Sequence, residues 1–207
     1  MRVVAILGQK GGSGKTTCAI HLAIAAARQK QKVVLLDLDP QGSAASWGRR
    51  RGQDELPVTV QAARIQEMST LLTEAKSAGL DLVLVDCPGR ADAIAMTMLE
   101  RADAVLVPCR PSILDMEASQ RTAEQAKVAR ARKAWIVLNA VPTRGTRHVE
   151  AQAALQEVME VSPAMLHARV AFADALNSGL SVEELEPEGH AAHEIRSLWR
   201  WLARAVA

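Results

Sequence analysis

A glycine-rich segment near the start of the chain limits its possible folds more than any other feature. Residues 8–17 read GQKGGSGKTT, directly after the apolar run Val3–Leu7 and directly before a stretch with helical spacing. Glycines let a backbone curl until successive N–H groups point into one concavity, where phosphate oxygens are held at the start of a helix. The sequence therefore predicts a phosphate-binding loop between a buried strand and a helix.

Apolar runs of strand length recur along the chain and alternate with segments of helical period. The runs are Val3–Leu7, Val33–Leu36, Leu82–Val85, Ala104–Val107 and Trp135–Leu138, with a weaker candidate at Val58–Val60. The helical segments are Thr17–Gln29, Ile65–Ala78, Ala93–Arg101, Met116–Arg132 and Val149–Val161. Because the runs are continuous rather than alternating, we expect strands buried on both faces of a parallel sheet. The prediction is an α/β fold in three layers, with a mainly parallel twisted sheet flanked by helices, and one domain over residues 1–207.

The composition excludes several other classes of protein. Hydrophobic residues make up 49% of the 207 residues, which is enough for a sizeable core and excludes intrinsic disorder as the main state. Aromatic residues make up only 2%, so recognition of nucleic acid by base stacking is not expected. No apolar run is long enough for a transmembrane helix, and the three widely spaced cysteines do not suit a disulfide framework. We expect a cytoplasmic protein.

Two lysines in the glycine-rich loop indicate what it binds. Lys15 is placed to reach the β- and γ-phosphates of a nucleotide, and the hydroxyl of Thr16 is placed to ligate Mg²⁺. The common pattern of such loops has a glycine where this chain has Gln9, and the chain carries a second lysine, Lys10, inside the loop. The positive charges of Lys10 and Lys15 repel each other, which is unfavourable unless a second group of negative charges approaches Lys10.

Residues 10–17, KGGSGKTT, resemble the deviant Walker A box of the ParA/MinD group of ATPases, which have the P-loop NTPase fold. The resemblance implies that ATP and Mg²⁺ are the ligands, and that two copies of the chain form a homodimer around ATP in which Lys10 touches the partner's nucleotide. It also implies that Lys10 and Lys15 act in a slow hydrolysis of ATP. The implied nucleotide-binding residues of the loop are Lys10, Gly11, Gly12, Ser13, Gly14, Lys15, Thr16 and Thr17.

Acidic residues follow two of the apolar runs. Alternation puts Asp37 and Asp39 on the same side of an extended segment, where two carboxylates are unfavourable without a cation or a proton between them. Asp86 ends the run Leu82–Val85 in a Walker B pattern and is expected to hold Mg²⁺. The resemblance to the family's D-x-D-P-Q switch box implies that Asp39 positions the attacking water and that Asp37 supports the Mg²⁺ shell. Gly89 would sense the γ-phosphate through its amide.

Weaker resemblances continue towards the C-terminus. Residues 107–112 resemble the family's proline-bracketed loop, and residues 169–182 resemble the C-terminal region of its partition proteins. Asn139 stands where relatives read the adenine edge, and an asparagine that ends a strand at a turn is the alternative. The chain starts at its first strand, so it is most similar to small partition ParA proteins without an N-terminal DNA-binding domain. The resemblance implies segregation of plasmid or chromosomal DNA with a ParB-like centromere-binding adaptor.

Basic residues are locally concentrated although the net charge is only +2. Arginines recur every fourth residue on one face of the last helical segment, and a second basic cluster ends the segment Met116–Arg132. Residues 49–51 read RRR, and we expect them to lie in a loop. In partition relatives such a surface binds DNA non-specifically through phosphates. The candidates for DNA contact are Arg130, Lys133, Arg196, Arg200 and Arg204.

The last helical segment also has an alternative interpretation. In MinD-like relatives a basic amphipathic helix at this position enters a membrane, and Trp199 and Trp201 are compatible with that use. The apolar stripe of Ile195, Leu198 and Leu202 is narrow, which favours a helix docked on its own domain. We therefore expect DNA rather than a membrane as the partner surface, no stable membrane association, and a nucleoid-associated location in the cytoplasm.

The same superfamily contains iron proteins of the nitrogenase type, which hold a cluster with cysteines. Cys87 and Cys109 are possible ligands, but each lies at the end of an apolar run beside a proline. Small buried thiols are common at such places, so we expect no iron–sulfur cluster.

Overall fold

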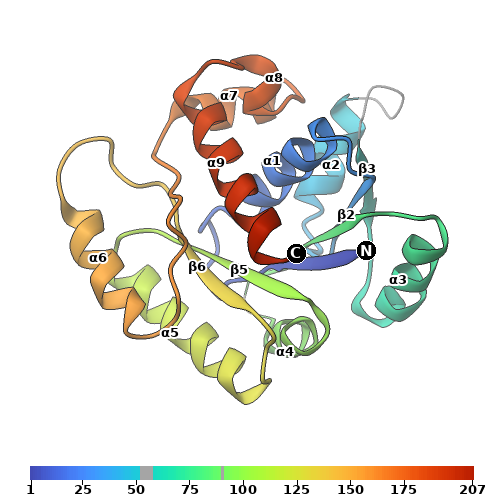
Figure 1. Cartoon of the computed structure of the whole chain (residues 1–207), viewed down its shortest axis with the longest axis horizontal. Helices are drawn as coiled ribbons and strands as arrows, with labels where there is room; N and C mark the ends of the chain where they lie inside the picture. Colours follow the sequence, from blue (N-terminus) through green and yellow to red (C-terminus); the bar gives the residue numbers. More distant parts are fainter. Residues whose placement is uncertain (52–57, 90) are drawn as a thin grey trace.

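In the computed structural model, which describes residues 1–51, 58–89 and 91–207, strands and helices alternate along the chain (Figure 1). All strand pairs of the sheet are parallel, and the strand order is β3-β2-β4-β1-β5-β6. This arrangement confirms the predicted α/β fold with a parallel sheet. The strands are β1 (Arg2–Ile6), β2 (Val33–Asp37), β3 (Val58–Ala62), β4 (Leu82–Asp86), β5 (Ala104–Cys109) and β6 (Ala134–Leu138).

The strands are continuous apolar runs because both faces of the sheet are covered. Along β1, Val4 and Ile6 belong to one core, whereas Val3 and Ala5 belong to the core on the other face. Each face therefore needs its own apolar residue at every second position. β3, at the edge of the sheet, has three exposed positions, which explains why its sequence is the weakest of the predicted strands.

Two layers of helices enclose the sheet. The helices that contribute to the first core are α1 (Lys15–Arg28), α2 (Ser43–Arg51), α7 (Val170–Asn177), α8 (Val182–Leu185) and α9 (His190–Ala205). The second core is covered by the 3-10 helix η2 (Ile65–Glu67), α3 (Met68–Ser77), α4 (Asp92–Arg101), α5 (Ile113–Val128) and α6 (Arg147–Gln156). None of the described helices is long and apolar enough to cross a membrane.

Helix α9 lies across α1 on the side of the molecule turned towards the viewer in Figure 1. Its apolar stripe of Ile195, Leu198 and Leu202 is fully buried, together with Trp199. Trp201 is half-buried and packs edge-on against Trp135 of β6, with ring centroids 5.0 Å apart. The prediction of a docked terminal helix is therefore confirmed.

Three local predictions need correction. Residues 49–51 end helix α2 and do not form a loop. Helix α5 begins at Ile113, earlier than predicted, because Ser112 caps it, and it ends at Val128 before Arg130 takes a left-handed φ of +50°. Helix α6 ends at Gln156, and Val161 instead forms a β-bridge with Ile136.

Candidate functional site

The loop between β1 and α1 has the curled backbone that the sequence predicts. Gly12 and Gly14 have φ values of +75° and +97°, a region that favours glycine. The carbonyl of Gly14 accepts a hydrogen bond from the N–H of Cys18 at 2.9 Å, so α1 begins directly at the loop. The Lys15 ammonium turns back and donates to the carbonyl of Lys10 at 3.1 Å. Both lysines of the motif therefore belong to one compact turn.

Asn139 packs against this loop from the end of β6. Its Nδ2 donates to the carbonyl of Ser13 at 2.6 Å, and a Cβ on Gly14 would lie 2.1 Å from that nitrogen. Gly14 is thus required by its φ and also by the approach of Asn139. The next residue, Ala140, has a φ of +50°, which is uncommon for a residue with a side chain. The adenine-reading role of Asn139 stays a prediction.

Two of the predicted carboxylates meet because β2 and β4 are neighbours. Asp37 is paired in register with Asp86 at the carboxyl ends of these strands. Asp37 is buried, and its two oxygens accept the N–H groups of Asp39 at 3.1 Å and Ala45 at 2.9 Å. These bonds hold the segment between β2 and α2. Asp37 is therefore engaged by backbone amides, and its part in a Mg²⁺ shell stays a prediction.

Asp86 has the chemistry of a metal-supporting carboxylate. It is fully buried, and neither oxygen accepts a hydrogen bond within 3.5 Å from the part of the chain that the structure describes. Burial raises the pKa of its carboxyl group to about 7, and the carboxylates of Asp37 and Asp39 add to this, while the Thr16 hydroxyl and the Lys15 ammonium oppose it. A buried carboxylate that accepts no hydrogen bond within 3.5 Å, near the Thr16 hydroxyl in the first turn of α1, fits the oxygen ligands that Mg²⁺ prefers.

The remaining predicted phosphate-site residues surround Lys15. Burial lowers the pKa of the Lys15 ammonium, an effect that the charges of Asp86 and Asp39 oppose. A Cβ on Gly89 would lie 3.5 Å from Lys15 Nζ and 3.5 Å from the N–H nitrogen of Gly11, so the segment after β4 touches the loop. Asp39 is half-buried and lines the cleft over the loop. The cleft thus brings together the glycine-rich loop, the D-x-D-P-Q box after β2 and the segment after β4.

Lys10 makes a contact within its own chain that was not predicted from the sequence. Its ammonium pairs with the carboxylate of Asp115 on α5, whose oxygen also accepts the hydroxyl of Ser112. Asp115 is buried, whereas 38% of the Lys10 side chain is exposed. Lys10 therefore lies at the surface with one side anchored to a buried acid.

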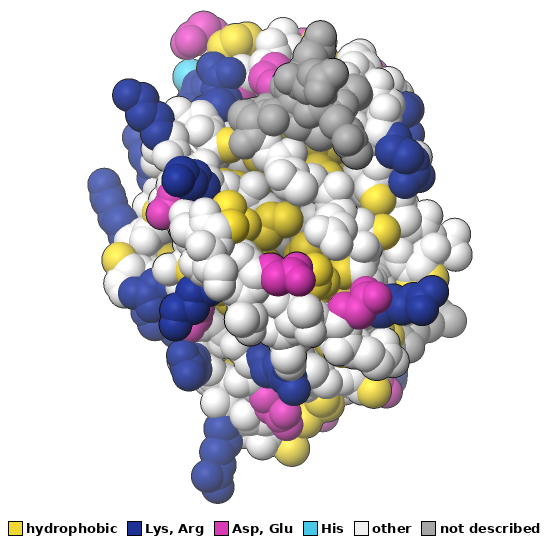
Figure 2. Space-filling view, turned by 90° about the vertical axis from the view of Figure 1, so that its right-hand side faces the viewer, with side chains coloured by type: hydrophobic (Ala, Val, Ile, Leu, Met, Phe, Trp, Pro, Cys, Tyr) yellow, Lys and Arg dark blue, Asp and Glu magenta, His cyan; other side chains and the backbone are white. Residues whose placement is uncertain are grey.

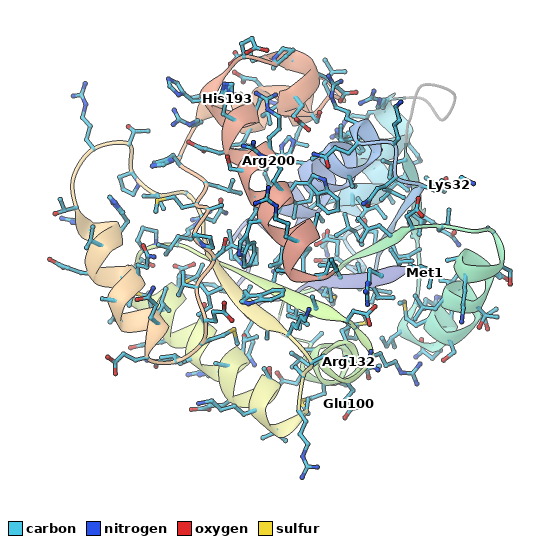
Figure 3. All side chains as sticks on the ribbon, viewed as in Figure 1. Met1, Lys32, Glu100, Arg132, His193 and Arg200 are labelled. Atoms are coloured by element: carbon cyan, nitrogen blue, oxygen red, sulfur yellow. The ribbon has the colours of Figure 1, made fainter. Side chains whose placement is uncertain are left out.

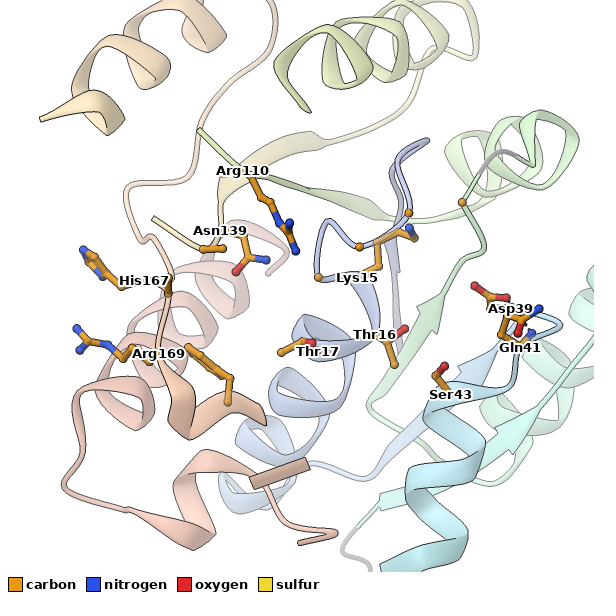
Figure 4. Close-up of a pocket in the computed structure, with 17 residues that line it drawn as sticks. Lys15, Thr16, Thr17, Asp39, Gln41, Ser43, Arg110, Asn139, His167 and Arg169 are labelled. Atoms are coloured by element: carbon orange, nitrogen blue, oxygen red, sulfur yellow. Dashed lines mark hydrogen bonds between the residues drawn. The ribbon is translucent and has the colours of Figure 1, made fainter. Parts of the chain in front are cut away.

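A cleft of about 520 Å³ extends from the loop towards α7. Lys15, Thr16 and Thr17 lie in its middle in Figure 4, with Asp39, Gln41 and Ser43 at one side and Asn139, His167 and Arg169 at the other. Some of the lining residues belong to segments that resemble the family, namely the D-x-D-P-Q box and residues 107–112 and 169–182, but the sequence did not predict that they line the cleft. The unpredicted lining residues are Gln41, Ser43, Arg110, Ala140, His167, Ala168, Arg169 and Phe172.

The wall beyond Asn139 is built by a segment that runs beside the extension of β6. Val141 forms a parallel bridge with His167, and the N–H of Ala168 donates to the carbonyl of Val141 at 2.8 Å. The chain then enters α7 at Val170. Backbone pairing thus carries residues 167–169 to the end of the cleft that is distant from Lys15.

The predicted DNA-contact residues lie mostly on α9. Arg200 and Arg204 are exposed, and in Figure 3 the labelled Arg200 lies on the side of α9 turned towards the viewer. Arg196 pairs with the buried Glu183 at 3.5 Å. Lys133 is exposed beside the end of α9, where its ammonium donates to the carbonyl of Ala205. Arg130 is also exposed, after the end of α5.

The three cysteines are free and buried. Burial raises the pKa of the Cys18 thiol to about 12 and that of Cys109 to about 11, and it raises the pKa of Cys87 well above its ordinary value. Within residues 1–51, 58–89 and 91–207, no three His, Cys, Asp or Glu side chains are grouped as a metal site. The thiols are thus placed as small core side chains.

Comparisons with known proteins agree with this geometry. Residues 4–182 match the family model described as the CobQ/CobB/MinD/ParA nucleotide binding domain. The chain is 36% identical to the maintenance of carboxysome distribution protein A of Gloeobacter kilaueensis, over 99% of this chain and 94% of that protein. It is 31% identical to the chromosome-partitioning ATPase Soj of Thermus thermophilus, over 96% of this chain and 94% of that protein. The structure of the septum site-determining protein MinD complexed with Mg-ADP, from Pyrococcus horikoshii, superposes with a TM-score of 0.77 at 20% identity, covering 100% of this chain and 98% of that one.

Proposed function

This chain belongs to the CobQ/CobB/MinD/ParA nucleotide-binding family, and we propose that it is a Mg²⁺-dependent ATPase of the ParA type that positions a cargo on DNA. In this proposal ATP binding produces a homodimer that binds DNA non-specifically, and hydrolysis releases it. The observation that carries the proposal is the loop itself, in which Lys10 and Lys15 lie in one turn and the Lys15 ammonium interacts with the carboxylates of Asp86 and Asp39.

The site supports hydrolysis through positioning and charge neutralisation, which are the main demands of phosphoryl transfer. Lys15 and the loop amides hold the phosphates of ATP. Thr16 and Asp86 hold Mg²⁺, which neutralises charge on the phosphates when it is bound. Asp39, at the edge of the cleft, orients the attacking water.

Dimerisation is the step for which Lys10 is available. Its side chain is partly exposed and borders a second depression of about 620 Å³, lined also by Asp39, Pro88 and Gly89. In the dimer Lys10 leaves Asp115 and contacts the phosphates that the partner holds. A loop with two lysines then meets the charge of two nucleotides rather than one.

The surface of α9 supports contact with DNA phosphates. In Figure 2, Lys and Arg side chains gather along the left margin. This margin is the side that is turned towards the viewer in Figure 1, where α9 lies. Arg200 and Arg204 are the strongest candidates because, among the described residues, neither is paired with an acid. Arg196 contributes less, since Glu183 already neutralises it. Phosphate contacts also suit a chain with few aromatic residues.

The membrane alternative is less well supported. Insertion of α9 into a lipid surface would need its apolar side, yet Ile195, Leu198 and Trp199 are packed in the core. Removing them from that core would cost more than a basic helix gains at a membrane surface. A location on the nucleoid, within the cytoplasm, follows from the DNA proposal.

The cargo has two candidates. One is plasmid or chromosomal DNA held by a ParB-like centromere-binding adaptor, which the relative named Soj favours. The other is a large protein body, because the Gloeobacter relative is named for the distribution of carboxysomes and matches 99% of this chain. With either cargo, this chain would bind DNA under the control of ATP. The two proposals differ only in the adaptor that stimulates hydrolysis.

DNA binding measured against salt concentration tests the proposal. We expect binding to need ATP, and each phosphate contact to contribute about −0.9 to the slope of log K against log salt. Asp39→Ala should trap the ATP dimer on DNA, whereas Lys10→Ala should bind ATP but form no dimer in sedimentation. Lys15→Ala should not bind ATP.

Charge reversals locate the surface. Arg204→Glu should weaken DNA binding and flatten the salt slope, whereas Lys76→Glu on α3, on the opposite layer of helices, should change neither. A flat slope for the unmodified protein, together with binding to anionic liposomes, would instead establish the membrane alternative.

A further inference from the structure

Glu194 makes four hydrogen bonds to the segment that forms the far wall of the cleft. Its Oε1 accepts the Nε and Nη2 of Arg169 at 2.9 and 2.7 Å, and lies 2.8 Å from Nδ1 of His167. Its Oε2 accepts the backbone N–H of His167 at 3.0 Å. One carboxylate on α9 therefore fixes two side chains and one amide of residues 167–169.

The hydrogen bonds between Glu194 and residues 167–169 are sheltered from water. Only 14% of the Glu194 side chain is exposed, and about a quarter of each partner side chain is. Burial alone would raise the pKa of this carboxyl group, but the bonds from Arg169 and His167 outweigh it and leave the pKa below its ordinary value. Glu194 is thus held as a carboxylate, and charge-assisted bonds of this kind are stronger than neutral ones.

Residues 167–169 face the part of the cleft that the phosphate loop does not fill. His167, Ala168 and Arg169 line that end together with Asn139, and in Figure 4 the labelled side chains of His167 and Arg169 lie at the end of the cleft opposite to Asp39, with Lys15 between. With the phosphates of a nucleotide on the loop, this end receives the nucleoside. Glu194 itself does not line the cleft, so it can act there only through the residues that it holds.

We propose that Glu194 is a positioning residue that fixes residues 167–169 as the nucleoside-side wall of the cleft and so sets the affinity for the base and ribose, but not for the phosphates. This inference rests on the proposed nucleotide-binding function. It gives α9 a second role beside its basic outer face: the same helix that presents Arg200 and Arg204 to solvent secures one wall of the cleft.

A comparison of two ligands separates this role from a general effect on folding. Calorimetry in the presence of Mg²⁺ would measure the affinities for ATP and for inorganic tripolyphosphate, which lacks the base and ribose. Glu194→Ala should lower the affinity for ATP about tenfold, the effect of roughly 1.4 kcal/mol, and leave that for tripolyphosphate unchanged. Glu194→Gln keeps one acceptor oxygen and should give an intermediate loss.

Glu184 supplies a matched control. It also holds an arginine, Arg51, and accepts the backbone N–H of Ser181, but it does not line the cleft. Glu184→Ala should lower the melting temperature without changing the ratio of the two affinities. An unchanged ratio in folded Glu194→Ala, or equal losses for both ligands, would overturn the inference.

The test also separates this inference from the proposed function. If the unmodified protein bound neither ligand, the proposed function itself would fail. If it bound ATP and the Glu194 variants did too with full affinity, only the role of Glu194 would fail. Should Glu194→Ala not fold, the Glu194→Gln variant carries the same comparison.

Discussion

The ammonium of Lys10 is paired with the buried carboxylate of Asp115 in the same chain. Asp115 lies near the start of α5, and Ser112, the residue that caps this helix, donates its hydroxyl to the same carboxylate oxygen. The lysine proposed to reach a partner's nucleotide is therefore held, in the single chain, by a residue 105 positions away in sequence. In the proposed dimer, this pair must break before Lys10 can act between chains.

Asp115→Asn should consequently favour the ATP-bound dimer. An asparagine still accepts the Ser112 hydroxyl but no longer holds the lysine by charge. Because Lys10 is partly exposed, we expect a modest gain of about 1 kcal/mol or less, or up to fivefold in the dimer dissociation constant. Sedimentation with a non-hydrolysable ATP analogue measures the dimer dissociation constant. An unchanged or weaker dimer would contradict the proposed cost of releasing Lys10.

Gly14→Ala should disrupt the loop more than any other glycine substitution of comparable φ. The new Cβ would meet Asn139 Nδ2 at 2.1 Å, in addition to the strain of a φ of +97°. Gly145 has a similar φ of +91° but no atom within 4 Å of an added Cβ, so Gly145→Ala should show the backbone strain alone, about 1 kcal/mol.

The comparison of these two glycines is made by nucleotide affinity and by urea unfolding. Gly14→Ala should lose ATP binding by more than tenfold while Gly145→Ala keeps it. Adding Asn139→Ala to Gly14→Ala should restore part of the loss, since it removes the clashing amide. Equal effects of the two glycine substitutions would show that the contact with Asn139 is unimportant.

Trp199→Ala should destabilise the protein by about 3–5 kcal/mol, the usual cost of removing a large aromatic side chain from a core. Trp199 is 1% exposed in the core shared by α1 and α9. Trp201, which is half-buried against Trp135, should cost less when replaced by Ala. Urea unfolding measures both. If α9 were instead free to enter a membrane, Trp199→Ala would leave the free energy of unfolding almost unchanged.

The phosphate loop and the switch carboxylates could be predicted because their signals are local. An apolar run followed by GQKGGSGKTT, or by Asp86, carries its strand and its chemistry within about ten residues. Parallel pairing then brings the ends of such runs to one edge, as in the register of Asp37 with Asp86. The start of α5 was placed three residues too late, because the cap that Ser112 forms with the N–H of Asp115 was not recognised in the sequence.

The second wall of the cleft could not be predicted, because it depends on how distant segments dock. Glu194 reaches residues 25 and 27 positions away, and it does so only once α9 has packed on α1. The helical state of residues 49–51 has a similar cause: Asp37 binds the N–H of Ala45 in the first turn of α2, and this anchors a segment whose arginines suggested a loop. Single residues in these contacts carry no periodic signal.

His21 shows how a buried titratable group links stability to pH. It lies on α1, fully buried, with its ring edge-on to Phe172 at 5.3 Å, and its Nδ1 accepts the N–H of Val182 at 3.4 Å. Burial lowers the pKa of the imidazole to about 3, and the charge of Glu184 opposes this only partly. The ring is therefore neutral in the folded protein near neutral pH.

The unfolded chain takes up a proton on His21 near pH 6.5, whereas the folded chain does so only near pH 3, so acid favours unfolding across this window. The free energy of unfolding should fall by about 1.5 kcal/mol from this residue between pH 6.5 and pH 5. Urea unfolding at both pH values should show a smaller fall in His21→Leu by that amount. His190→Gln, at the exposed start of α9, should behave as the unmodified protein, and equal falls in all three proteins would refute the assignment to His21.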